Sequence, residues 1–246
     1  MARIPSKVVI YGQQGVGKSY LASTFSNPIF FDVENGLRFL PNISKVKVKT
    51  YSDFTRLMVK LLKSEKKYDT VVIDSIDWLM ALIIADVAGS GGSTYQERLN
   101  NSTNTLNKSN GGYGNGKQVL ANNVHDILLS LFDELIDMGY TVVLTAHATK
   151  KTITAQDGSS IQQMAPKIDD NTMSTFAEWA DHIFYLTDQD GKRSLRVSPD
   201  YNILAKNRLG LEGDVPVEGL DIEKLLDPDT ARKVADETIK SNKENN

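Results

Sequence analysis

The chain has 246 residues, of which 40% are hydrophobic and 24% are charged, and it contains no cysteine. The lack of cysteine excludes disulfides and cysteine-ligated metal sites. The formal net charge of -3 excludes a surface that is basic overall, although a local basic groove stays open. No apolar run approaches the roughly 20 residues that a membrane-spanning helix needs, and the first residues lack the apolar core of a signal peptide. We therefore expect a cytoplasmic protein with no membrane partner.

Short β-branched runs alternate with helical patterns along the first two thirds of the chain. We expect strands at residues 7–11, 29–34, 46–50, 70–74 and 141–147, and helices at residues 18–25, 52–62, 75–88 and 119–138. Residues 89–117 are crowded with Gly, Ser and Asn, which predicts a mobile loop. The alternation of strands and helices predicts an α/β fold with a mostly parallel central sheet that helices cover on both faces.

The last third of the chain has a different pattern. Residues 150–167 alternate on either side of a Gln-Asp-Gly turn at 156–158, which predicts a hairpin. Two further strands are expected at residues 182–187 and 194–197, joined at Asp190 and Gly191. From residue 221 we expect a helical extension, whose polar end at residues 243–246 is predicted to be disordered.

The segment from Gly12 to Ser19 reads Gly-x-x-x-x-Gly-Lys-Ser between a predicted strand and a predicted helix. Glycines let backbone N–H groups close around phosphate oxygens, and Lys18 can reach the β- and γ-phosphates while the Ser19 hydroxyl ligates Mg²⁺. This Walker A pattern, or P-loop, predicts binding of ATP with Mg²⁺. The alternative is an idle glycine turn, which the strand and helix on either side disfavour. The expected nucleotide contacts are Gly12, Gln13, Gln14, Gly15, Val16, Gly17, Lys18, Ser19 and Tyr20.

Two carboxylates and a histidine follow predicted strands, whose carboxyl ends meet at one rim of a parallel sheet. Asp74 is expected to hold Mg²⁺ as the Walker B carboxylate, or else to cap the following helix. Glu34 is expected to orient and deprotonate the attacking water, whereas Asp32 would lie inside the sheet or on its other face. The alternative for both Glu34 and Asp32 is a role in forming the turn at Asn35 and Gly36. His147 can sense the γ-phosphate through a hydrogen bond, or bond to the backbone instead.

Together these segments resemble the RecA-like ATPases, and most closely the small phage recombination ATPases. The resemblance covers roughly residues 7–210, and it is carried by residues 9–19, 30–34, 70–75, 143–147 and 205–210. It implies a RecA-like ATPase domain over residues 1–220, followed by the helical extension. It also implies that the strand ending at His147 lies between the Walker A and Walker B strands, beside Lys18. RecA has glutamine at the position of His147.

Residues 206–208 resemble the Lys-x-Arg element of RecA-like hexameric helicases. The resemblance implies that Lys206 and Arg208 reach the γ-phosphate bound by a neighbouring subunit. The alternative is a solvated pair of charges on an exposed strand.

The resemblance further implies ATP hydrolysis coupled to homo-oligomerisation, as a ring or a filament, on single-stranded DNA. The setting would be phage recombination or replication in the host-cell cytoplasm, with a phage single-strand-binding or replication protein as a further partner. Aromatic and cationic side chains suited to single strands lie in residues 89–117 and 148–171: Tyr95, Arg98, Lys108, Tyr113, Lys117, Lys150, Lys151 and Lys167. We expect Trp78 and Trp179 to pack internally instead.

Two rival functions remain open at the level of sequence. One is a P-loop switch or helicase-loading ATPase that acts on a protein partner without binding DNA directly. The other is an interaction module that binds ATP without turnover. Stimulation of hydrolysis by DNA would separate the first reading from both rivals.

Overall fold

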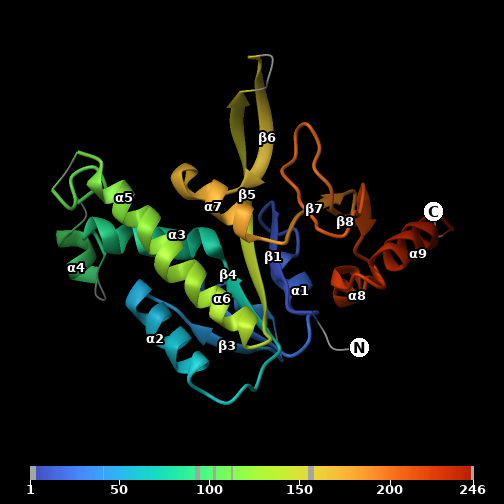
Figure 1. Cartoon of the computed structure of the whole chain (residues 1–246), viewed down its shortest axis with the longest axis horizontal. Helices are drawn as coiled ribbons and strands as arrows, with labels where there is room; N and C mark the ends of the chain where they lie inside the picture. The colour runs from blue at the N-terminus through green and yellow to red at the C-terminus, as the bar shows by residue number, and fades with distance from the viewer. Residues whose placement is uncertain are drawn as a thin grey trace.

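The computed structural model describes residues 4–40, 42–91, 95–101, 104–111, 113–154 and 158–244. Their strands form one sheet in the order β3-β2-β4-β5-β1-β7-β8-β9, and β6 pairs with β5 beyond it (Figure 1). Neighbouring strands from β3 to β7 are parallel, whereas the β7–β8 and β8–β9 pairs are antiparallel. The strands are β1 (Lys7–Gly12), β2 (Pro28–Asp32), β3 (Ser44–Lys47), β4 (Thr70–Asp74), β5 (Thr141–Thr154), β6 (Ser160–Pro166), β7 (His182–Gln189), β8 (Lys192–Arg196) and β9 (Asp214–Pro216).

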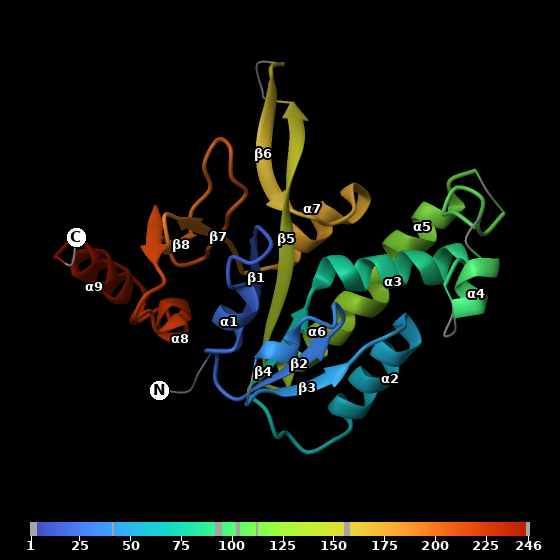
Figure 2. The same cartoon turned by 180° about the vertical axis from the view of Figure 1, so that it is seen from behind.

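Helices cover both faces of this sheet (Figures 1 and 2). One face carries the larger group, and the other carries α1 together with the two last helices. The helical segments are α1 (Lys18–Ala22), the 3-10 turn η1 (Leu37–Phe39), α2 (Tyr51–Leu62), α3 (Ile76–Ala88), α4 (Tyr95–Asn100), α5 (Asn115–Asn122), the π-helical segment η2 (Asn123–Leu129), α6 (Ser130–Asp137), α7 (Asp170–Trp179), α8 (Ile222–Leu226) and α9 (Ala231–Glu244).

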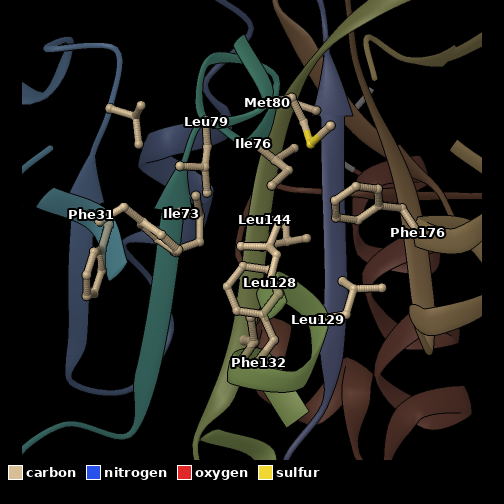
Figure 3. Close-up of a cluster of buried hydrophobic side chains, with 14 of the residues drawn as sticks. Phe31, Ile73, Ile76, Leu79, Met80, Leu128, Leu129, Phe132, Leu144 and Phe176 are labelled. Atoms are coloured by element: carbon tan, nitrogen blue, oxygen red, sulfur yellow. The ribbon is translucent and has the colours of Figure 1, made fainter. Parts of the chain in front are cut away.

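The period-two alternation of the strands divides the core into two layers. In β1, Val9 and Tyr11 join the layer under α2, α3 and α6, while Val8 and Ile10 join the layer under α1 and α8. Figure 3 shows the first layer, in which side chains of the strands meet those of the covering helices: Phe31, Ile73, Leu144, Leu79, Leu128, Phe132 and Phe176. Burial of strands on both faces explains their continuous apolar runs, and the predicted fold class is confirmed.

The segment at residues 89–117 is more ordered than predicted. The helix α4 and the start of α5 lie within it, so the expectation of a mobile loop is wrong for those residues. The reason lies in the asparagines that suggested a loop. Side-chain amides of Asn104 and Asn110 donate to the carbonyl groups of Gly89 and Val87, near the end of α3. They thereby satisfy carbonyls that a helix end leaves unpaired.

The hairpin predicted around residues 156–158 is formed by β5 and β6, although residues 155–157 lie outside the described chain. The strand β5 does not stop at His147, as predicted, but continues to Thr154. Beyond the sheet it pairs with β6, from Ala148 opposite Pro166 to Thr154 opposite Ser160. This projecting hairpin stands out of the molecule at the carboxyl end of the parallel strands (Figures 1 and 2).

The C-terminal extension packs against the sheet. Ile222 and Leu225 of α8 and Ala231 of α9 are buried in the same layer as Val8 and Phe25. The helix α9 runs to Glu244, so the expected disorder is wrong for residues 243 and 244, while residues 245 and 246 lie outside the described chain. The division of the chain at residue 221 stays a prediction. No helix of the described residues combines the length and apolarity needed to cross a membrane.

Candidate functional site

The carboxyl ends of β1, β2, β4 and β5 meet at one rim of the sheet. The strand register pairs Gly12 with His147, and Asp32 with Asp74. A cavity of about 440 Å³ opens there, lined in part by the P-loop, Glu34, Asp74 and His147. The structure therefore brings together the P-loop and three other residues predicted for the site. The strand β5 lies between β4 and β1, as the resemblance implied.

The P-loop encloses the side chain of Lys18. Gly15 and Gly17 have φ angles of 80° and 102°, a backbone conformation that favours glycine. The Lys18 ammonium is buried and donates hydrogen bonds to the carbonyl oxygens of Gly12 and Gln13, at 3.1 and 2.9 Å. Burial lowers the pKa of Lys18, although nearby carboxylates act in the opposite direction. The cation is thus held inside the loop whose N–H groups are suited to phosphate oxygens.

The two predicted metal ligands are in contact. The Ser19 hydroxyl donates to Oδ2 of Asp74 at 2.8 Å, and the Thr145 hydroxyl donates to Oδ1 of the same carboxylate. Burial raises the pKa of Asp74, and these two hydrogen bonds oppose that rise. A hydroxyl and a carboxylate side by side fit Mg²⁺, which prefers oxygen ligands and takes others from phosphates and water. Ser75 rather than Asp74 occupies the N-cap position of α3, and its side chain makes no capping hydrogen bond.

Glu34 lies two residues beyond the end of β2 rather than at its last position. The backbone N–H groups of Val33 and Glu34 donate to the carbonyl of Asp74, which holds the turn against β4. The Glu34 side chain is 29% exposed, and its Oε1 lies 3.8 Å from Nε2 of His147. Burial raises the pKa of Glu34 above its usual range. Asp32, by contrast, is buried and accepts the N–H of Gly36, so it stabilises the turn.

His147 is fixed by Asp77, a residue that the sequence analysis missed. Oδ2 of Asp77 lies 2.9 Å from Nδ1 of the imidazole, and Oδ1 accepts the backbone N–H of His147 at 3.2 Å. A carboxylate only accepts, so Nδ1 carries the proton and Nε2 faces Glu34. The one signal in the sequence is the spacing of Asp77, three residues after Asp74 and in the first turn of α3. The side chain of Asp77 is only 7% exposed.

Lys206 and Arg208 lie away from the P-loop of their own chain. Nζ of Lys206 donates to the carbonyl groups of Ala177 and Glu178, and Nε of Arg208 lies 2.8 Å from Oδ1 of Asp181. Asp181 bonds to the backbone of Lys7, at the amino end of β1. The structure therefore does not bring this pair to its own candidate site, and their action on a neighbouring subunit stays a prediction.

The residues predicted to contact DNA differ in their surroundings. Lys150 and Lys167 are exposed on or beside the projecting hairpin, as are Tyr113, Lys108 and Lys117 in the other segment. Lys151 instead bonds to the carbonyl of Ile168 and to Asp170, whose carboxylate lies 2.5 Å from its ammonium. The side chains of Tyr95 and Arg98 lie outside the described part of the chain.

The two tryptophans also differ. Trp179 packs against Phe132 and donates its indole N–H to Asp133, as the prediction of internal packing requires. Trp78 on α3 is 48% exposed, so that prediction is wrong for Trp78. It points outward because α3 is apolar around most of its circumference, and one side remains uncovered.

A family model described as an AAA domain matches residues 4–209 of the chain. The chain belongs to this AAA domain family. Members of this family are P-loop ATPases, which agrees with the P-loop and its surrounding rim. Nucleotide binding therefore follows from the family, in addition to the geometry of the site.

A curated relative from Bacillus subtilis (strain 168), the SPbeta prophage-derived uncharacterized protein YorG, is 24% identical over 194 residues. The match covers 75% of this chain and 53% of the relative, so the chain spans about half the length of the curated protein it matches. Among solved structures, the flagellar accessory protein FlaH from Methanocaldococcus jannaschii aligns over 87% of this chain and 85% of its own. The TM-score is 0.44 and the sequence identity is 12%.

Proposed function

We propose that this chain binds ATP with Mg²⁺ and hydrolyses it as a homo-oligomer on single-stranded DNA, in phage recombination or replication. The observation that carries hydrolysis is the meeting of Lys18, Ser19, Asp74 and Glu34 at one rim. A P-loop that served only to bind would not need a half-buried carboxylate beside it. Glu34 is that carboxylate, and it lines the same cavity as His147, with its Oε1 3.8 Å from Nε2 of the imidazole.

The proposed roles follow from the contacts of each residue. Lys18 binds the β- and γ-phosphates, and Ser19 and Asp74 hold Mg²⁺, which supplies positive charge to the transferring phosphoryl group. Glu34 accepts the proton of the attacking water as a carboxylate. Because burial raises the pKa of Glu34, the residue is a better proton acceptor than an exposed glutamate, and its protonation at low pH removes the base.

Two observations support the DNA arm of the proposal. The projecting hairpin carries the exposed Lys150 and begins at Ala148, directly after His147. A nucleic acid bound there would therefore contact the strand whose residue His147 lines the nucleotide cavity. The relative in Bacillus subtilis is described as prophage-derived, which supports a phage setting. The net charge of -3 and the pairing of Lys151 with Asp170 favour the rival, a P-loop switch or helicase loader that acts on a protein.

The deciding experiment is a measurement of ATP hydrolysis with and without oligothymidylate, at two salt concentrations. We expect DNA to stimulate the wild type, and stimulation to weaken at high salt because phosphate contacts release counterions. Lys18→Ala should abolish binding of ATP, while Glu34→Gln should bind ATP and lose hydrolysis by about 100-fold or more. A rate of hydrolysis that DNA does not change would favour the switch or helicase loader that acts on a protein. Binding of ATP without hydrolysis would favour the interaction module that binds ATP without turnover.

A further inference from the structure

The hairpin of β7 and β8 places a cation beside the P-loop. Asp190 and Gly191 at its turn have φ angles of 54° and 82°, as a two-residue hairpin turn requires. Asp188 accepts the N–H of Gly191 at 2.8 Å, and the carbonyl of Arg193 accepts the N–H of Val217 at 2.9 Å. The backbone of Arg193 is therefore held between two segments: β7, where Asp188 is opposite it in the strand register, and the residue Val217 after β9.

The guanidinium group of Arg193 covers Gly17 of the P-loop. The strand β7 lies parallel to β1, with Leu186 opposite Gly12, so this hairpin begins at the same rim as the P-loop. A Cβ atom placed on Gly17 would lie 2.7 Å from Nη1 of Arg193. The hydrogen bonds and ion pairs of the described residues include none from this half-buried guanidinium. A cation thus lies against the residue that precedes Lys18, with its donors free.

The carboxylates at the rim, together with a bound triphosphate, carry more negative charge than Lys18 alone can offset. Three carboxylates, those of Glu34, Asp74 and Asp77, lie near Lys18, which is the cation inside the loop. ATP brings further negative charge, and the one Mg²⁺ bound with it offsets only part of that charge. Glu34 follows β2, Asp74 ends β4 and Asp77 lies in α3, and both strands are on the side of β1 that faces β5. Arg193 comes from the other side of β1, beside β7.

This arrangement of charges would orient a bound triphosphate. The γ-phosphate belongs on the side of Glu34 and Asp74, where the water and Mg²⁺ would be held, so the opposite side of the loop receives the phosphate nearest the ribose. We infer that Arg193 binds the α-phosphate of the nucleotide held by its own chain. The inference rests on the proposed roles of Glu34 and Asp74. It adds an arginine in cis to the site, separate from the predicted action of Arg208 on a neighbour.

A contact with the α-phosphate is the same in ATP and in ADP, so it contributes to binding and not to the chemical step. Arg193→Ala should raise the dissociation constants of MgATP and of ADP by the same factor, about 10- to 100-fold, as expected for a charge-assisted hydrogen bond. The rate at saturating ATP should stay within about two-fold of the wild type. Arg193→Lys should recover part of the affinity, since it keeps the charge without the planar fork.

The matched control is Lys192→Ala, which removes an exposed cation from the adjacent position of β8, where the side chain points to the opposite face. It should bind both nucleotides like the wild type. Circular dichroism checks the fold, and Arg193→Gln, which keeps the aliphatic stem, repeats the test if the alanine variant is unstable. If Arg193→Ala binds both nucleotides normally while Lys18→Ala binds neither, the inference is wrong and the proposed function stands. A loss confined to turnover also contradicts it, and a wild type that binds no nucleotide contradicts both.

Discussion

Asp77 holds His147 through two groups at once, the imidazole Nδ1 and the backbone N–H. Such a contact decides which ring nitrogen carries the proton, and therefore which nitrogen is presented to Glu34. The contact is specific to a carboxylate, because an amide in its place offers one acceptor and one donor. Asp77 is thus a positioning residue, and its effect should be visible on the histidine itself.

We predict that Asp77→Asn moves the proton of neutral His147 from Nδ1 to Nε2. The asparagine side-chain oxygen would still accept the backbone N–H of His147. Its NH₂ group would then face Nδ1, which must accept a hydrogen bond from it and therefore cannot carry the proton. Histidine ¹⁵N chemical shifts report the tautomer, and the chain has only three histidines to assign. We expect hydrolysis to fall by about 10-fold or more with ATP affinity retained. His125→Gln, at an exposed site, is the control. An unchanged tautomer in Asp77→Asn would rule out the positioning role.

The residues that the sequence predicted and those that it missed differ in how they are placed. Lys18, Ser19 and Asp74 belong to local patterns, in which a strand, a turn and a helix follow one another, and such patterns can be read directly. Asp77 meets His147 across 70 residues, and Arg193 reaches the P-loop from a hairpin near the other end of the chain. Both contacts depend on strand order and register, which no local pattern specifies.

At the scale of elements, strands were easier to predict than helices. Buried parallel strands read as short β-branched runs, so the ends of β1, β2 and β4 were located to within two residues. The end of β5 was placed seven residues too early, and β9 was not predicted. Helix ends were harder: α1 ends at Ala22 rather than near residue 25, and the expected helix at residues 119–138 comprises α5, η2 and α6. The prediction from composition was least accurate at residues 89–117. There, asparagine side chains donate hydrogen bonds to backbone carbonyl groups and so order a segment that was expected to be a mobile loop.

The projecting hairpin gives a prediction at this scale. Neutralising Lys150 and Lys167 together should weaken binding of oligothymidylate and flatten its salt dependence, by about 0.7 of a log–log unit for each phosphate that the protein ceases to bind. Lys151 is spared because its ammonium is already paired with Asp170. The control is Lys60→Gln, which removes a positive charge on the exposed side of α2. Fluorescence anisotropy of a labelled oligonucleotide gives both quantities, and a double variant with the affinity and slope of the wild type would exclude the hairpin from the DNA site.

At the scale of the whole molecule, the position of Arg208 bears on whether two copies of the chain share an active site. It lies near the amino end of β1, while the candidate site lies at the carboxyl end. An arginine so placed can act on a phosphate only if a second copy brings its site to that surface. The Arg208 side chain is 61% exposed, and Asp181 also accepts the backbone N–H of Lys7, so removing Arg208 should affect stability little.

We predict that Arg208→Ala binds ATP almost normally but hydrolyses it about 1,000-fold more slowly, as for other arginines supplied from a neighbour. Mixing Arg208→Ala with Lys18→Ala should restore part of the activity, because some interfaces then pair an intact P-loop with an intact arginine. Arg56→Ala, at an exposed site on α2, controls for loss of charge. A specific activity that stays constant on dilution of a proven monomer would contradict shared sites.

The strand β5 joins two regions that would otherwise be far apart. It runs from the buried core through His147 into the projecting hairpin, and the carbonyl of His147 accepts the N–H of Lys167 at 2.8 Å. We expect binding at the hairpin to be coupled to binding at the P-loop, and such coupling is reciprocal. A ligand on the hairpin that tightens nucleotide binding tenfold must itself be bound tenfold more tightly when nucleotide is present, a coupling of about 1.4 kcal/mol. Titrating either ligand in the presence of the other must therefore return the same coupling energy.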